Sequence, residues 1–483
     1  MNRKFTSFFL AVTALFLSLC SLMTVGVSAA GTMNESIPSQ NLHPDDADAL
    51  PDTVSFPDVR DGDWFQKDVL RLVEKGIVHG YTDGLFHPER EVSNAEFVKM
   101  LLEALEVDVS ETLDLMLFDT HWASGYISFS YKHGILTDED IISGFDPDAP
   151  ITREVMTRMT VLGLGIELVK IDAPFSDETD VYADTAYREY LLRGYLLDDN
   201  TRIYDKENTA LRSEASSIIT RILDYREDPY AYKRDVILDN ASKAELNTES
   251  EMLDLFYVLN REFITKFTFK TSVPYNTWSA YYRHANVIHL EHFYSSYLHC
   301  SYIANSATYN LTFEYLNDID LMKQYDIDTR TAAKEIISQI ITDDMDDTAK
   351  IKAIHDYIVL NCEYDYTNYV NSTIPAEARL AYGTLINKSA VCQGYTAAFN
   401  LLCKEAGIRS VVVTGTSPSS TDTHAWNVVL IDGKIYHIDA THDDPVPDQK
   451  GKVSYKYFML TSDQMLSLGY LWDRSLVDVK YFY

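Results

Sequence analysis

Three residues in the C-terminal part of the chain have side chains suited to attack on a carbonyl group: Cys392, His424 and Asp439. A thiolate can form a bond to a carbonyl carbon, an imidazole can accept and return the proton, and a carboxylate can orient the imidazole. They can act together only if the local structure brings them to one place.

The segment that follows Cys392 has the pattern of a helix. Apolar residues recur at helical spacing from Tyr395 to Ala406, and Gly407 is a typical helix stop. Cys392 is therefore predicted at or just before a helix N-terminus. Free backbone amides and the positive end of the helix dipole favour a thiolate there.

The segments that carry His424 and Asp439 have the pattern of a hairpin. Residues 424–431 and 434–440 are predicted strands, and Asp432-Gly433 between them is a strong indication of a two-residue turn. The turn sets the register, so that Ile431 should face Lys434.

This register predicts which side chains meet. Counting back from the turn pairs Trp426 with Asp439, and His424 with Thr441. Because side chains alternate between the two faces, His424 and Asp439 should emerge on one face as diagonal neighbours. If the helix of Cys392 packs against that face, the nucleophile, base and orienting carboxylate are complete.

These motifs resemble the bacterial transglutaminase-like superfamily, whose chemistry is papain-like. The resemblance rests on VCQGY (391–395), HAWN (424–427) and YHIDATHDDP (436–445), and covers roughly residues 346–445. It implies an α+β domain with a Cys-His-Asp triad. Relatives usually carry Trp where this chain has His442, so the pocket should differ in shape there.

Other residues near the triad have two interpretations each. Gln393, together with the backbone amide of Cys392, could stabilise an oxyanion, or its side chain could face solvent. Trp426 could wall the cleft or simply pack in the hairpin. His437 and His442 are interpreted as structural histidines.

The composition limits the class of protein. The chain has 483 residues, which suggests about three domains. The formal net charge is −32, from 73 acidic and 41 basic residues, so nucleic acid and anionic membranes are not expected partners.

The N-terminal residues have the features of an export signal. Arg3 and Lys4 precede an apolar run, and small residues follow it, so residues 1–30 are predicted to be a secretory signal peptide, with an uncleaved anchor as the alternative. Lipid attachment at Cys20 is disfavoured by its neighbours. Residues 31–53 are a predicted linker, and no later segment is apolar enough to span a membrane.

The remaining cysteines form no recognisable framework. Cys300, Cys362, Cys392 and Cys403 match no disulfide or zinc pattern, and Cys403 is predicted to be a buried apolar group. Four histidines also lack a recognised metal spacing. They are His284, His289, His292 and His299. We therefore predict no metal and no cofactor.

An internal repeat occupies the first half of the mature chain. Phe86, Phe145 and Tyr204 recur at one constant interval, each between a glycine-terminated helix and a second helix for which Ser93, Thr152 or Ser213 is a candidate N-cap. The predicted repeats are residues 54–110, 115–170 and 173–225.

These repeats, over residues 54–225, resemble the S-layer homology domain, a three-repeat helical bundle that binds secondary cell-wall polysaccharide. The resemblance implies sugar-binding candidates at Trp64, Trp122, Arg153 and Arg212, with the arginine motif shifted in the third repeat. Arginine can form a paired hydrogen bond to a carboxylate of an acidic sugar. The alternative is that the repeats are only a helical spacer.

The rest of the chain divides into three parts. Residues 226–245 are a predicted linker, residues 246–345 a mixed region that includes helix 249–263 and strand 308–316, and residues 346–483 the transglutaminase-like domain.

We thus expect a multidomain, exported protein located at the cell wall. The first functional hypothesis is a cysteine enzyme that transfers or hydrolyses acyl groups of protein or peptide amides. The second is a non-catalytic adhesion or scaffold protein whose transglutaminase-like domain binds peptides. Natural substrate and acyl acceptor are left open by the sequence.

Overall fold

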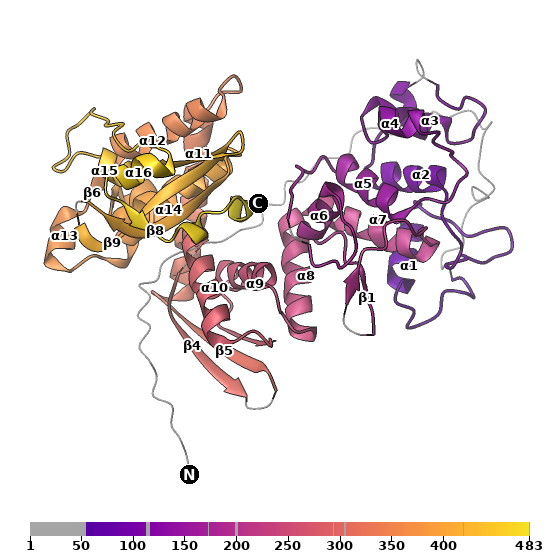
Figure 1. Cartoon of the computed structure of the whole chain (residues 1–483), viewed down its shortest axis with the longest axis horizontal. Coiled ribbons are helices and arrows are strands. Elements are labelled where there is room, and N and C mark those ends of the chain that lie inside the picture. Colours follow the sequence, from indigo (N-terminus) through magenta and orange to yellow (C-terminus); the bar gives the residue numbers. More distant parts are fainter. Residues whose placement is uncertain are drawn as a thin grey trace, which may run out of the picture. The chain divides into compact units, whose positions relative to one another are not determined.

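The computed structural model describes residues 55–112, 116–171, 173–198, 201–292, 294–303, 306–418 and 420–482. The predicted signal peptide (1–30) and linker (31–53) lie outside the described residues. The chain divides into two compact units between Val236 and Ile237. The N-terminal unit is mainly helical, whereas the C-terminal unit combines helices with sheets, as expected (Figure 1).

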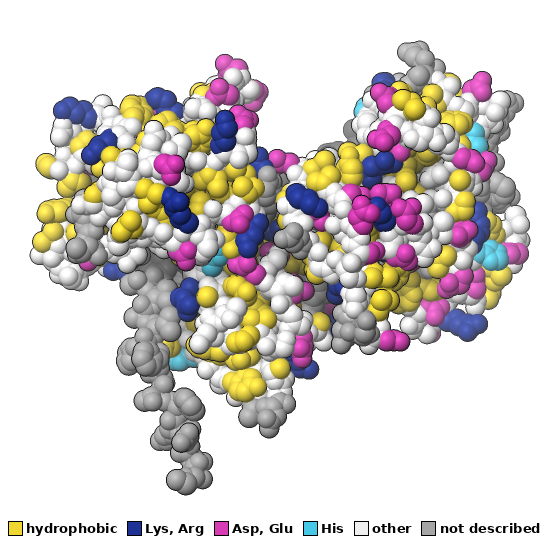
Figure 2. All heavy atoms as spheres, in the orientation of Figure 1, with side chains coloured by type: hydrophobic (Ala, Val, Ile, Leu, Met, Phe, Trp, Pro, Cys, Tyr) yellow, Lys and Arg dark blue, Asp and Glu magenta, His cyan; other side chains and the backbone are white. Residues whose placement is uncertain are grey.

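Short helices make up most of the N-terminal unit. Its elements are α1 (Gln66–Glu74), α2 (Asn94–Ala104), η1 (Val109–Thr112), α3 (Ser124–Lys132), α4 (Asp138–Ile142), α5 (Arg153–Gly163), α6 (Val181–Arg188), β1 (Tyr195–Leu196), β2 (Arg202–Ile203) and α7 (Arg212–Glu227). Helix α8 (Pro229–Lys243) begins in this unit and contains the division between the two units. Acidic side chains gather on the visible face of this unit, in keeping with the net charge of −32 (Figure 2).

A ring of backbone hydrogen bonds joins the three repeats. The N–H of Val92 donates to the carbonyl of Ala210 at 2.9 Å, that of Ala210 to Ile151 at 2.9 Å, and that of Ile151 back to Val92 at 2.8 Å. Each residue lies two positions before the helix that its repeat contributes, α2, α7 or α5. The predicted three-repeat bundle is thus confirmed as a closed arrangement.

The inner helices of the repeats share one core. Leu101 of α2, Met159 of α5 and Ile219 of α7 are all fully buried in the same hydrophobic cluster. Burial of such side chains contributes on the order of 2 kcal/mol each, which holds together a unit of short helices.

Two of the three predicted helix caps are present. The Ser93 hydroxyl accepts the Glu96 N–H at the start of α2, and the Thr152 hydroxyl caps α5 in the same way. The third prediction is wrong: Leu211 is the N-cap of α7, and Ser213 lies inside the first turn, where its hydroxyl donates to the Pro88 carbonyl at 2.9 Å.

This correction changes the alignment of the repeats. Since α7 begins at Arg212 and α5 begins at Arg153, the two arginines occupy the same helical position. The prediction that the arginine motif is shifted in the third repeat is therefore wrong. Its capping residue is an apolar leucine where the second repeat has Thr152.

The predicted linker 226–245 is largely helical. Helix α8 covers Pro229–Lys243, and its residues Tyr232 and Val236 pack in a second hydrophobic cluster of the N-terminal unit. The sequence did not predict this helix, because its charged residues interrupt the apolar positions, such as Tyr232 and Val236, that pack in the cluster.

The C-terminal unit contains two antiparallel sheets, with strand orders β3-β5-β4 and β10-β9-β8-β11. Its helices are α9 (Glu249–Arg261), α10 (Tyr275–Ile288), η2 (Leu290–His292), α11 (Ile319–Ile340), α12 (Asp347–Asn361), α13 (Tyr366–Asn371), η3 (Ala376–Arg379), η4 (Gly383–Asn387), α14 (Cys392–Glu405), α15 (Ala440–Asp443), α16 (Ser462–Ser467), η5 (Arg474–Leu476) and η6 (Val479–Phe482). Its strands are β3 (Lys266–Lys270), β4 (Ser295–Ile303), β5 (Thr308–Tyr315), β6 (Glu363–Tyr364), β7 (Ser389–Ala390), β8 (Ser410–Ser417), β9 (Ser420–Ile431), β10 (Lys434–Ile438) and β11 (Leu471–Trp472).

Helix α14 is the central helix of this unit. It packs against β9 and β8 on one side and against α11 and α12 on others (Figure 1). Gly394 in its first turn has no room for a side chain, since a Cβ would lie 2.7 Å from the Ala378 carbonyl oxygen. The glycine of the VCQGY motif therefore allows the start of α14 to approach η3 closely.

Among the described residues, no helix combines the length and the apolar character needed to cross a bilayer.

Candidate active site

The β9-β10 hairpin has the predicted turn and register. Asp432 and Gly433 have φ values of 49° and 71°, the left-handed pair that a two-residue turn requires. Lys434 faces Ile431, and the pairing continues to Ile438 opposite Asn427. The hairpin prediction is confirmed over this range.

The predicted strand continues two residues too far. Strand β10 ends at Ile438, and Asp439 is the N-cap of the short helix α15, its Oδ1 accepting the His442 N–H at 3.1 Å. The expected ladder pairs of Trp426 with Asp439 and of His424 with Thr441 are thus absent. An aspartate that can satisfy a free helix amide favours capping over a further strand residue.

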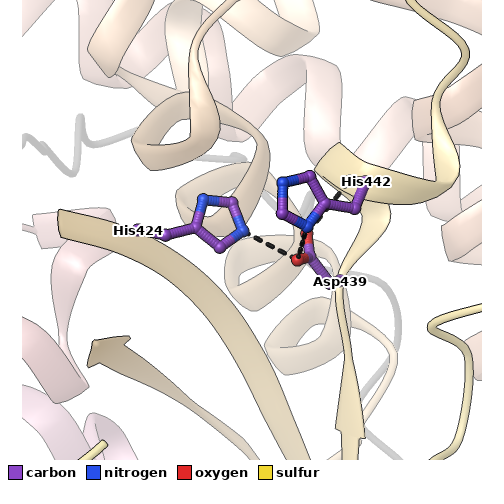
Figure 3. A group of neighbouring side chains, drawn as sticks. All are labelled: His424, Asp439 and His442. Carbon is purple, nitrogen blue, oxygen red and sulfur yellow. Dashed lines mark hydrogen bonds and ion pairs between the residues drawn. The ribbon is translucent and has the colours of Figure 1, made fainter. Parts of the chain in front are cut away.

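His424 and Asp439 nevertheless meet. Asp439 Oδ2 lies 2.7 Å from His424 Nε2, and the two residues are only 1% and 6% exposed, respectively (Figure 3). Burial alone would lower the pKa of His424, but Asp439 and Cys392 raise it to about 10. Burial alone would raise the pKa of Asp439, but His424 and His442 hold it well below its usual range. The dyad is therefore a carboxylate paired with an imidazolium at neutral pH.

Cys392, the third residue of the predicted triad, belongs to helix α14. It is the first residue of α14, it is half-buried, and it is one of the groups that raise the pKa of His424. Because Asp439 occupies Nε2, Nδ1 is the ring nitrogen left available to the sulfur. An imidazolium beside the sulfur and the helix N-terminus behind it both stabilise a thiolate.

The first turn of α14 offers donors for an oxyanion. Its N-cap, Val391, has no side-chain acceptor, so the amides of Cys392 and Gln393 are not capped by it. Gln393 itself is half-buried as the second residue of the helix. Backbone N–H groups at such a position can stabilise negative charge that develops on a carbonyl oxygen.

Trp426 lies beneath the dyad. It is 1% exposed, its ring is nearly parallel to that of His424 at 6.0 Å between centroids, and its indole N–H donates to His437 Nδ1 at 3.0 Å. His437 also contacts the Ser462 hydroxyl at 3.0 Å, and burial lowers its pKa to about 4. Trp426 is thus a buried support of His424, and His437 is a neutral partner of the indole.

Two further side chains contact Asp439. His442 Nδ1 lies 2.9 Å and the Tyr470 hydroxyl 2.7 Å from its Oδ2. The His442 and His424 rings are stacked, with centroids 4.3 Å apart and an interplanar angle of 15° (Figure 3). The sequence identified position 442 as unusual but provided no indication of Tyr470, which is one of 33 tyrosines.

The other cysteines lack these surroundings. Burial raises the pKa of Cys362 to about 12 and that of half-buried Cys300 to about 11. Cys403 is fully buried in α14, as predicted, and burial raises its pKa as well.

The nitrogen and oxygen atoms of His424, Asp439 and His442 lie within 4.8 Å of one another, the one such potential metal-ligand group found within the described ranges. Hydrogen bonding already accounts for this geometry, because both imidazoles share the oxygen of a single carboxylate. A cation bound by these three residues would have to displace the protons that the imidazoles share with the carboxylate. The residues therefore fit a proton-sharing cluster better than a metal centre.

The candidate wall-binding arginines are buried at equivalent helix starts. Arg212 is 5% exposed, and its guanidinium donates to the carbonyls of Phe86 at 3.0 Å and His79 at 2.8 Å. Arg153 is 7% exposed and donates to the Tyr204 carbonyl at 3.0 Å and to Glu214 at 3.1 Å. Both arginines thus tie one repeat to the next.

The candidate tryptophans are more accessible. Trp64 is 63% exposed and lies edge-on to Phe65, whereas Trp122 is half-buried beside His121. An exposed indole of this kind can stack on a sugar ring.

Comparisons with known proteins agree with this division of the chain. Residues 55–98 match the S-layer homology domain, and residues 334–440 match the family described as the Transglutaminase-like superfamily. The chain therefore contains an S-layer homology domain followed by a transglutaminase-like domain. The second match begins 12 residues before the predicted start at 346.

Curated relatives include S-layer proteins. The chain is 29% identical over 107 residues to the Surface-layer 125 kDa protein of Lysinibacillus sphaericus, which is 21% of this chain and 9% of that protein. It is 29% identical over 109 residues to the S-layer protein sap of Bacillus anthracis, which is 22% and 13% of the two chains. The chain thus spans only a small part of the length of these relatives.

Among solved structures, the chain is similar to that of a TGase, with 16% identity and a TM-score of 0.25 over 42% of this chain and 56% of the other.

Proposed function

We propose that this protein is a cysteine enzyme held at the cell wall, which cleaves or exchanges amide bonds of protein or peptide substrates. The observation that supports this most strongly is the buried His424–Asp439 pair beside Cys392 at the start of α14. A carboxylate, an imidazolium and a thiol in this order match the requirements of acyl transfer through a thioester.

The reaction divides into two steps. The Cys392 thiolate forms a bond to the amide carbon, and the amides of the first turn of α14 stabilise the resulting oxyanion. His424 then transfers its Nδ1 proton to the departing amine nitrogen as the carbon–nitrogen bond breaks. In the second step, neutral His424 takes a proton from water or an acceptor amine, which attacks the thioester and releases the acid or the new amide.

A labelled primary amine offered with a casein-like protein tests this proposal. We expect the full chain to incorporate the amine with release of ammonia, or to generate new N-termini, and Cys392→Ala to do neither. Product identity distinguishes transfer from hydrolysis. If the wild-type chain produces none of these products, the scaffold hypothesis gains instead.

Alkylation of the thiols provides an independent measurement. Cys300 is a matched control, since it is also half-buried but lacks a histidine partner. At pH 7, iodoacetamide should modify Cys392 at least about tenfold faster than Cys300. Equal rates would exclude an activated nucleophile.

Attachment to the wall is proposed for the N-terminal unit. The match to the S-layer homology domain and the exposed indole of Trp64 support a role in binding secondary cell-wall polysaccharide. The chain would thereby act on surface proteins or wall peptides within its reach.

Trp64→Ala should weaken binding of the full chain to purified cell walls by roughly fivefold, because an exposed indole contributes contact area but little to the core. The unfolding temperature of the N-terminal unit should not change. Ile142→Ala is the matched control, because Ile142 is 85% exposed in the same unit and should be silent. Sedimentation with purified walls measures the binding of both variants. Equal binding by Trp64→Ala and wild type would show that Trp64 does not contribute to wall binding.

A further inference from the structure

Asp439 accepts an unusual number of hydrogen bonds at one oxygen. His424 Nε2 at 2.7 Å, His442 Nδ1 at 2.9 Å and the Tyr470 hydroxyl at 2.7 Å all converge on Oδ2, while Oδ1 accepts the His442 N–H at 3.1 Å. The carboxylate is 1% exposed, so these bonds replace water as its solvation. Four donors from three segments of the chain therefore fix the orientation of the carboxylate.

These bonds also define where the protons lie. An ionised carboxylate only accepts, so His424 carries its proton on Nε2 and Tyr470 gives its single proton to Asp439. His442 Nδ1 contacts the Tyr470 oxygen as well as Asp439, and must therefore be a donor. In neutral His424 the free electron pair is thus at Nδ1, the nitrogen left available to Cys392.

Ring packing restricts the remaining freedom of His424. Its ring is stacked on His442 at 4.3 Å and lies nearly parallel to Trp426 at 6.0 Å. Rotation of the imidazole out of this plane would break the hydrogen bond to Asp439 and collide with the His442 ring.

We propose that His442 and Tyr470 are positioning residues of the active site, which hold Asp439 and thereby direct Nδ1 of His424 at Cys392. The proposal rests on the proposed function, since it concerns the geometry of the same triad. It assigns a role to two side chains whose hydrogen bonds reach the reaction through Asp439. His442 thus supplies a second imidazole at the carboxylate that orients His424.

The titratable groups around this cluster come from several elements. They are Cys392 of α14, His424 of β9, His442 and Asp443 of α15, and Tyr457 and Tyr470 of the segments that flank α16. Tyr457 packs its ring on His442 and Tyr470 at 5.5 and 5.6 Å, and the Lys456 ammonium lies 4.8 Å from the centre of this ring. It therefore provides a matched control for the loss of a hydroxyl group.

The test measures the rate at which iodoacetamide modifies Cys392 in the full chain at pH 7. His442→Phe keeps a ring but loses the donor, and Tyr470→Phe loses only the hydroxyl; each should slow the reaction by roughly 5- to 20-fold. His442→Asn retains a donor at the place of Nδ1 but loses the ring stacked on His424, so it should react faster than His442→Phe without reaching the wild-type rate. Tyr457→Phe should have no effect.

The same substitutions are then repeated in an Asp439→Ala background. Because the hydrogen bonds lost in His442→Phe and Tyr470→Phe act through Asp439, the effects of these two variants there should fall to less than about twofold. Equal slowing in both backgrounds, no slowing in either, or a His442→Asn variant no faster than His442→Phe would each overturn the proposal. If His442→Phe does not fold by circular dichroism, Tyr470→Phe in the two backgrounds decides the question.

Failure of the proposed function gives a different result. In that case wild-type Cys392 reacts no faster than Cys300, whereas failure of the positioning proposal alone leaves Cys392 fast in the wild-type chain.

Discussion

Replacing His424 with alanine should reduce turnover by roughly 10³-fold, because the leaving amine then has no proton donor and the thiolate no counter-ion. Modification of Cys392 by iodoacetamide at pH 7 should fall to the rate of Cys300. His437→Gln is the matched control: this histidine is on the same hairpin, and glutamine can still accept the indole hydrogen bond of Trp426. Amine incorporation by the two variants measures the difference, and comparable activity would remove His424 from the mechanism.

The same residue sets the pH dependence of turnover. Since the pKa of His424 is raised to about 10, the imidazolium persists below that pH and is lost above it. Turnover needs the imidazolium to protonate the amine, so it should fall as the pH rises through 10. Alkylation needs only the thiolate and should not fall there. Parallel pH profiles for both reactions would contradict this role.

Replacing Trp426 with alanine should lower the free energy of unfolding of the C-terminal unit by about 3–5 kcal/mol. The indole is 1% exposed and contacts Tyr470 and Trp472 edge-on at 5.2 and 5.8 Å, so its removal leaves a cavity and deprives His437 Nδ1 of its donor. Trp426→Phe should cost less, since it keeps most of the volume.

Denaturant unfolding of the full chain, followed by circular dichroism, measures this effect in the transition of the C-terminal unit. The transition of the N-terminal unit provides an internal control and should stay unchanged. An unchanged C-terminal transition in Trp426→Ala would mean that the indole does not support the hairpin.

The hairpin of the site could be predicted because its determinants are local. Asp432 and Gly433 adopt left-handed backbone angles that few other residues tolerate, and this turn alone sets the register of the strands on either side. The helix of Cys392 was equally local, since Gly407 marks its end with φ at 73°. Both elements were defined by residues within a few positions of one another.

The remainder of the site depends on contacts between distant positions. Tyr470 lies 31 residues beyond Asp439 and belongs to no periodic pattern that could have predicted their hydrogen bond. The end of β10 was missed because Asp439 competes for two roles, strand residue and helix cap, and the amide of His442 decides between them. Likewise Leu211 caps α7 without a polar side chain because the Glu214 carboxylate accepts its N–H at 3.0 Å.

The ring of hydrogen bonds through Val92, Ile151 and Ala210 has a consequence for attachment to the wall. Each repeat donates to one neighbour and accepts from the other, so none is terminal and none can detach without leaving two broken bonds. The three repeats should consequently unfold together rather than fray one by one. If this bundle holds the chain at the wall, a protease cut inside any repeat would release the C-terminal unit in a single step.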